Sequence, residues 1–319
     1  MHENVFAGTC RNPQGVCAMK HSLTITLILL GMFLLTQIVG LGVVASYAPH
    51  IEQVVKFNED NTTTLENITT YNLPYGMDPP QGIEPKSSLV SIIIALVIAI
   101  VLMILLMRFN AEKFLRLWFF LVVIIALGIT LTAALPKFAA ASFIAILVAL
   151  PLAYFKVFKR NIIIHNFTEV MIYPGIAAIF VPLVTITTAI VLLVIISLYD
   201  MYAVWHTGFM QRMARYQIKT LKIFSGFFIP YMNSKDKAGS KKSVKVSVAI
   251  LGGGDVVFPI ILASVVMQQL SFWHGFIVSI GATLALAVLF YMSEKGKFYP
   301  AMPFISIGCF IALGIAYLI

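Results

Sequence analysis

A chain of 319 residues that is 60% hydrophobic and only 11% charged is too apolar for a soluble globular protein and is typical of a polytopic membrane protein. The formal net charge of +9 does not indicate a nucleic-acid partner, because the basic residues lie in short gaps between apolar stretches without an aromatic stripe beside them. Three cysteines are too few and too scattered for a disulfide framework.

Apolar stretches long enough to cross about 30 Å of hydrocarbon, at about 20 residues per helix, predict nine transmembrane helices. The predicted fold class is therefore an all-α polytopic membrane protein, with residues 1–319 as a single membrane domain. Pro182 should end a helix and so divides one long apolar run into the fifth and sixth spans. The predicted spans are Ser22–Tyr47, Ser87–Met107, Phe114–Leu135, Ala139–Phe155, Asn166–Val181, Leu183–Val204, Val246–Leu270, Gly275–Met292 and Pro300–Leu318.

The distribution of Lys and Arg predicts the orientation. Of the 22 such residues, 19 lie on the side of the N-terminus, which predicts a cytoplasmic N-terminus and an external C-terminus in a cell membrane. Residues 1–182 then hold five spans with an acidic external loop at 49–86, and residues 183–319 hold four spans with a cytoplasmic loop at 205–245. In that loop, residues 223–231 form an apolar patch, interpreted as a plug, a self-cleavage site or a surface anchor.

Two aspartates, Asp200 and Asp255, lie in apolar spans, whereas the other three lie in polar loops. Because a charge in the bilayer costs roughly 2.5 to 3.5 kcal/mol, such acids indicate a functional site. Helix rise places Asp200 about 25 Å from the external end of its span and Asp255 about 14 Å from the cytoplasmic start of its own, so both lie toward the cytoplasmic side. Two adjacent carboxyl groups cannot both ionise easily, and a pair that shares one proton is suited to hydrolysis.

The residues around these acids favour close approach of a backbone. Gly252, Gly253 and Gly254 remove side chains before Asp255, although small residues also serve helix packing in membranes. The last span opens with Pro300 and Pro303, which predicts an extended or loosely wound start that a substrate strand could pair with. An ordinary proline in the first turn of a helix is the alternative for Pro300.

Three short motifs carry a family resemblance. Tyr199-Asp200, Gly252-Gly253-Gly254-Asp255 and Pro300-Ala301-Met302 resemble the Tyr-Asp, Gly-x-Gly-Asp and Pro-Ala-Leu motifs of the presenilin and signal peptide peptidase family of intramembrane aspartyl proteases, with Met302 where the family has Leu. The segment His165–Glu169 also resembles presenilin. With a cytoplasmic N-terminus, the chain is most similar to an archaeal-type presenilin homologue.

The resemblance implies an intramembrane aspartic endopeptidase with Asp200 and Asp255 as the catalytic pair. The implied substrate-binding residues are Tyr199, Gly252, Gly253, Gly254, Pro300, Ala301 and Met302. The implied substrates are single-span transmembrane helical proteins in the lipid bilayer, with neither metal nor cofactor required. Homo-oligomerisation and accessory subunits are both left open.

The acids in apolar segments have two further interpretations. A proton- or cation-coupled transporter would also use two intramembrane acids and proline-broken helices, but no inverted repeat is visible in the chain. Glu169 is a third acid in an apolar setting, and because it lies four residues after His165 it is interpreted as an interfacial carboxylate.

Overall fold

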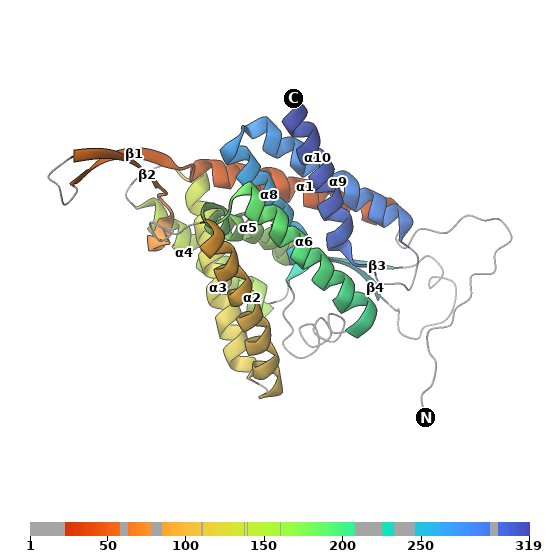
Figure 1. Cartoon of the computed structure of the whole chain (residues 1–319). Coiled ribbons are helices and arrows are strands. Elements are labelled where there is room, and N and C mark those ends of the chain that lie inside the picture. Colours follow the sequence, from red (N-terminus) through yellow and green to blue (C-terminus); the bar gives the residue numbers. More distant parts are fainter. Residues whose placement is uncertain are drawn as a thin grey trace, which may run out of the picture.

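The computed structural model describes residues 23–57, 63–77, 85–109, 111–136, 138, 140–159, 161–207, 225–232, 246–293 and 299–319 (Figure 1). Most of these residues are helical. The helices are α1 Leu23–Ser46, α2 Pro85–Arg108, α3 Glu112–Ala134, α4 Ala141–Tyr154, α5 Ile162–Phe180, α6 Ile186–Tyr202, α8 Gly253–Gln269, α9 Phe272–Met292 and α10 Ala301–Leu318, and the strands are β1 His50–Phe57, β2 Thr63–Thr70, β3 Gly226–Met232 and β4 Val246–Gly252.

Within the described residues, seven helical segments are long and apolar enough to cross a membrane, while α8 and the apolar part of α2 are shorter. Their positions follow the predicted spans, and α5 starts four residues before the predicted fifth span. These segments identify an integral membrane protein. Nine membrane crossings and the orientation of the termini stay predictions.

The division of the fifth and sixth predicted spans is confirmed. A short 3₁₀ turn, Val181–Leu183, with Pro182 at its start, separates α5 from α6. Thr185 then caps α6, because its side chain accepts a hydrogen bond from the Thr188 amide while the Thr188 hydroxyl accepts one from the Thr185 amide. Proline thus ends one helix and a capping box begins the next.

The prediction of one continuous helix from Val246 to Leu270 was wrong. Residues Val246–Gly252 form β4, which pairs antiparallel with β3, and α8 begins only at Gly253. Alternating β-branched residues followed by three glycines favour a strand here and disfavour a helix. Asp255 is therefore in the first turn of α8, and the depth inferred from helix rise does not apply to it.

The predicted loops contain further structure. In the loop 49–86, predicted to be external, β1 and β2 form an antiparallel hairpin that projects from the helices (Figure 1, left). In the loop 205–245, the apolar patch continues into β3, so part of it is one strand of the β3–β4 hairpin. The rest of that loop, residues 208–224 and 233–245, lies outside the described residues.

Helix α8 is the centre of the core. It contacts α1, α5, α6, α9 and α10, and Val256, Ile260 and Leu262 are fully buried. Gln37 of α1 donates a hydrogen bond from Nε2 to the Val256 carbonyl oxygen, at 3.1 Å. The helix that carries Asp255 is therefore held by neighbours on several sides.

Helices α9 and α10 approach closely where Gly281 faces Gly308. A Cβ atom at Gly308 would lie 2.6 Å from the Gly281 carbonyl oxygen and 2.4 Å from the Ala285 Cβ. Both obstacles are rigid, so any side chain here must push the two helices apart. Small residues at such crossings allow the close packing on which helix association in membranes depends.

We expect Gly308→Ala to lower the free energy of unfolding by about 1–3 kcal/mol, because the added methyl group overpacks the α9–α10 contact. Gly314→Ala is the matched control on the same helix, since nothing lies within 4 Å of a Cβ atom there. Thermal unfolding of both variants in detergent measures the difference. Equal melting temperatures would contradict the proposed packing role of Gly308.

Candidate functional site

Asp200 is held by the N-terminus of α10. Its side chain is buried near the end of α6, and Oδ2 accepts a hydrogen bond from the Met302 amide at 3.1 Å. The first amide groups of a helix lack intrahelical acceptors, so a carboxylate is a natural partner for them. Pro300 is extended, with φ −67° and ψ 120°, and the helix starts at Ala301. The predicted loose start is thus a single extended residue followed by a helix.

A second contact fixes α6 against α10. The hydroxyl groups of Ser197 and Ser306 are hydrogen-bonded at 2.8 Å, in the buried interface next to Asp200. The Met302 side chain is also buried and belongs to a small cluster with Leu192 and Ile196 of α6. The Pro300–Met302 segment therefore has a structural role, and its predicted contact with substrate stays a prediction.

The two predicted acids lie on helices that contact each other, α6 and α8. Asp255 lies in the first turn of α8, where its carboxyl group interacts electrostatically with that of Asp200 and accepts a hydrogen bond from the Gly252 backbone. Gly252 caps this helix with an extended conformation, φ −64° and ψ 144°. Asp200 and Asp255 thus come from α6 and α8, and each is held by backbone donors at the start of a helix.

The three glycines before Asp255 have different surroundings. A Cβ atom at Gly252 would lie 3.0 Å from Asp255 Oδ2, and one at Gly253 would lie 2.9 Å from the Tyr173 hydroxyl. At Gly254, which is exposed, the nearest atom would be 3.7 Å away on Phe258. Gly253 is therefore a packing residue, whereas Gly254 leaves open space beside the acids.

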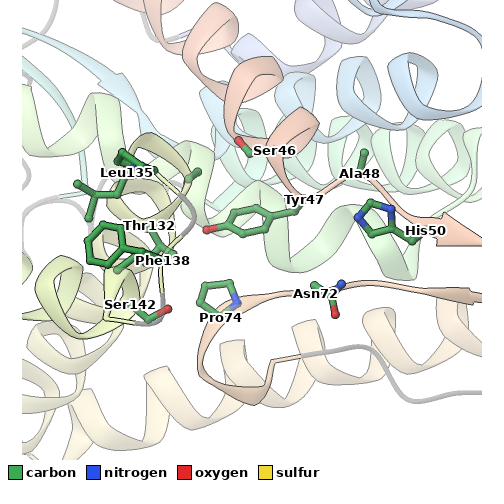
Figure 2. Close-up of a pocket in the computed structure, with 13 residues that line it drawn as sticks. Ser46, Tyr47, Ala48, His50, Asn72, Pro74, Thr132, Leu135, Phe138 and Ser142 are labelled. Carbon is green, nitrogen blue, oxygen red and sulfur yellow. The ribbon is translucent and has the colours of Figure 1, made fainter.

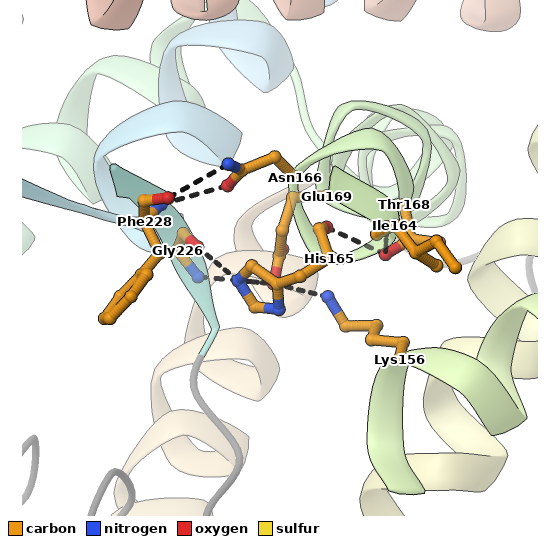
Figure 3. Close-up of polar contacts among 8 residues, drawn as sticks. All are labelled: Lys156, Ile164, His165, Asn166, Thr168, Glu169, Gly226 and Phe228. Carbon is orange, nitrogen blue, oxygen red and sulfur yellow. Dashed lines mark hydrogen bonds and ion pairs between the residues drawn. The ribbon is translucent and has the colours of Figure 1, made fainter. Parts of the chain in front are cut away.

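Figure 3 shows a polar cluster that the sequence interpretation missed. Lys156, in a π-helical turn after α4, forms a buried ion pair with Glu169 of α5, and each side chain is 1% exposed. Glu169 is therefore buried and paired inside the protein, and its predicted position at the membrane interface stays a prediction. Its Oε1 also accepts a hydrogen bond from the Gly226 amide, at 3.4 Å. The only signal in the sequence is a lysine 13 residues before a glutamate. Counting Lys and Arg to predict the membrane orientation does not show that these two residues form an ion pair.

Tyr199, next to Asp200, has a side chain that is 40% exposed, and nothing in the structure tests its predicted contact with substrate. Among the described residues, no group of three or more His, Cys, Asp or Glu side chains could hold a metal ion. A separate cavity of about 440 Å³ lies where α1, α3 and α4 meet the first strand, lined by residues such as Tyr47, Asn72 and Ser142 (Figure 2). None of the predicted site residues lines it.

Comparison with known proteins agrees with this geometry. A model of the family "Signal-peptide peptidase, presenilin aspartyl protease" matches residues 68–319. Two solved structures of a presenilin family intramembrane aspartate protease, in C222 and P2 space groups, are each 20% identical to the chain, with TM-scores of 0.55 and 0.56. The alignments cover 91% and 93% of this chain and 95% and 97% of theirs, which shows a shared fold. No curated protein matches.

The surroundings of the glycines lead to a paired test. We expect Gly253→Ala to lower the free energy of unfolding by about 1–3 kcal/mol, because the methyl group collides with Tyr173 and lies 3.0 Å from Ser225 Oγ. Gly254→Ala, the neighbouring control, should unfold at the wild-type temperature or above it. Differential scanning fluorimetry on purified protein compares them. A larger loss for Gly254→Ala would contradict the assignment of Gly253 as the packing residue.

Proposed function

Since the chain belongs to the signal-peptide peptidase, presenilin aspartyl protease family, we propose that it hydrolyses peptide bonds in single-span transmembrane proteins with Asp200 and Asp255 as its catalytic pair. Family and fold together make it an intramembrane aspartyl protease. The finer proposal is supported by the packing of α6 against α8, which carry these two carboxyl groups, and by the electrostatic interaction between the groups.

The chemistry follows from two carboxyl groups that share one proton. The ionised carboxylate takes a proton from a water molecule, whose oxygen attacks the scissile carbonyl carbon, while the protonated acid donates a hydrogen bond to the carbonyl oxygen. Collapse of the tetrahedral intermediate breaks the C–N bond and transfers a proton to the leaving amine. The backbone donors at Met302 and Gly252 hold the carboxyl groups in place during these steps.

The β3–β4 hairpin offers an edge on which an unwound substrate could lie. The amide and carbonyl of Phe228 bond to α5 and so face away from β4, which makes Phe228 and Ile250 a pair without mutual hydrogen bonds. By the same alternation, the backbone groups of Val248 and Ile250 face the outer edge of β4. Within the described residues this sheet has two strands, so we propose that substrate adds to that edge as an extended strand.

On this proposal, the substrate strand runs along β4 toward Gly252 and meets the acids where α8 begins. Gly254 is exposed and leaves space beside Asp255, in agreement with a substrate backbone passing there. Pro300, Ala301 and Met302 would contact it from the side of Asp200. A substrate helix must unwind locally to bind in this way, because strand addition requires extended backbone.

Asp200→Asn and Asp255→Asn should each reduce cleavage by at least about 100-fold, because either change removes a group that moves a proton. The measurement uses purified protein and a single-span reporter substrate in liposomes, with products identified by mass spectrometry. Gly314→Ala serves as the control, since that position is open and remote in sequence from both acids. Cleavage by either Asn variant at a rate near that of the wild type, or none by the wild type, would refute the proposal.

The same liposomes separate a protease from a transporter that depends on these acids. If wild-type protein moved protons or cations across the bilayer without cleaving the reporter, and both Asn variants abolished the flux, the transporter would be the better explanation.

A further inference from the structure

Strand β3 has an outer edge that is occupied by side chains instead of by another strand. Asn166 of α5 donates from Nδ2 to the Phe228 carbonyl oxygen, and the Phe228 amide donates to Asn166 Oδ1, both at 3.0 Å (Figure 3). One amide side chain therefore makes the two hydrogen bonds that a residue of a neighbouring strand would make.

The next outward-facing residue on β3 is also occupied. The Gly226 carbonyl oxygen lies 2.9 Å from His165 Nε2, and the Gly226 amide donates to Glu169 Oε1. The outward-facing residue after Phe228 is Pro230, which has no amide hydrogen to leave unpaired. The backbone N–H groups on this edge of β3, from Gly226 to Pro230, thus all have partners on α5.

The buried ion pair supports this arrangement. Lys156 is turned into the protein by the π-helical turn Phe155–Lys159 and contacts Glu169 Oε1, the same oxygen that accepts from Gly226. Because a buried ion pair pays a large desolvation cost, its presence is weak evidence for stability. A better explanation for the ion pair is that Lys156 fixes the orientation of the Glu169 carboxylate, because Oε1 of that group accepts the hydrogen bond from the backbone of β3.

From β3 the path to the catalytic acid is short. Gly226 pairs with Gly252, the residue that caps α8, and Asp255 follows three residues later. Phe227 is fully buried and packs edge-to-face on Tyr173 of α5, with ring centroids 5.7 Å apart. A shift of β3 relative to α5 must therefore move the start of α8.

We propose that Asn166, His165 and Glu169, with Lys156 anchoring Glu169, form a positioning clamp that fixes Asp255 relative to Asp200 by holding the outer edge of β3. This inference rests on the proposed function, because it assigns the clamp to the same reaction. The four residues do not touch the reacting groups. They act through β3, β4 and the cap of α8.

Asn166→Ala should lower kcat by about 10- to 100-fold with KM within about threefold of wild type, because a small misplacement of a reacting group is enough for such a loss. Amide hydrogen exchange at Leu251–Asp255, measured without substrate, should become about tenfold faster. Asn166→Asp keeps the acceptor for the Phe228 amide but places a second acceptor oxygen against the Phe228 carbonyl, so its kcat should also fall below that of the wild type.

Asn161→Ala is the matched control on the same helix. Asn161 caps α5 by accepting hydrogen bonds from Ile163 and Ile164, so its loss destabilises the helix without contact to β3. If Asn161→Ala lowers kcat and accelerates exchange as much as Asn166→Ala at an equal loss of melting temperature, the clamp is only a stability element and the proposal is overturned. Unchanged exchange in Asn166→Ala also overturns it.

A second set of variants tests the anchor. Lys156→Met removes the lysine partner of the buried Glu169 carboxylate, which keeps only His165 and the Gly226 amide, and should express poorly. The double variant Lys156→Met/Glu169→Gln removes both charges and retains an acceptor for Gly226. The double variant should recover kcat to within about threefold of wild type. If the double variant folds but has the same hydrogen-exchange rates and kcat as Asn166→Ala, the acceptor oxygen at position 169 does not hold β3. The proposed role of Glu169 is then refuted.

The two proposals can fail separately. Absence of cleavage by the wild type would count against the proposed function, while hydrogen exchange in Asn166→Ala and Asn161→Ala would still decide whether the clamp holds the start of α8.

Discussion

The position of Asp255 depends on the pairing of two glycines. Gly226 of β3 lies opposite Gly252 of β4, and α8 begins at the next residue, so the acid sits where a strand turns into a helix. Gly226 has a φ angle of 153°, which residues with a side chain rarely adopt. Extended backbone is tolerated in an apolar environment only where its polar groups have partners. Strand β3 meets that requirement on one side by pairing with β4 and on the other through α5.

The other acid is held by a different means. Asp200 depends on the amide groups at the start of α10, and the Ser197–Ser306 hydrogen bond fixes that helix against α6. One carboxyl group is thus placed by packing between two helices and the other by a strand–helix junction. The junction is the weaker of the two, because a two-stranded sheet is marginally stable unless it packs against other elements. This difference explains why the polar contacts from α5 gather at β3.

The features that could be predicted from the sequence are the helices, which follow from the length of the apolar runs, and the two aspartates, which follow from short motifs. Apolar length located the helices, and Pro182 separated α5 from α6 as expected. The motifs led to Asp200 and Asp255, which lie on the contacting helices α6 and α8. The stretch from Val246 to Gly252 was assigned incorrectly because a short apolar run fits a strand and a buried helix equally well. Its partner β3, which decides between them, begins 20 residues earlier in the chain.

The reason why the polar cluster around Glu169 could not be predicted is a different one. Lys156 was counted as a cytoplasmic charge, and only the π-helical turn shows that it points inward. A turn of this kind adds one residue to a helical turn and redirects the side chains that follow, and hydrophobic periodicity does not reveal it. Asn166 lies in the segment His165–Glu169 that resembles presenilin, but the sequence alone does not show that its side chain contacts β3.

The bidentate contact of Asn166 also determines which backbone groups β4 presents. Hydrogen-bonding directions alternate along a strand, so a shift of one residue in β3 against α5 would exchange inward-facing and outward-facing groups. With Phe228 bound to Asn166, the backbone N–H and C=O groups of Val248 and Ile250 face the edge of β4 that points away from β3. The side chains of Ala249 and Leu251 are buried in the core. The same two hydrogen bonds therefore link the placement of Asp255 to the register of any strand that adds to this edge.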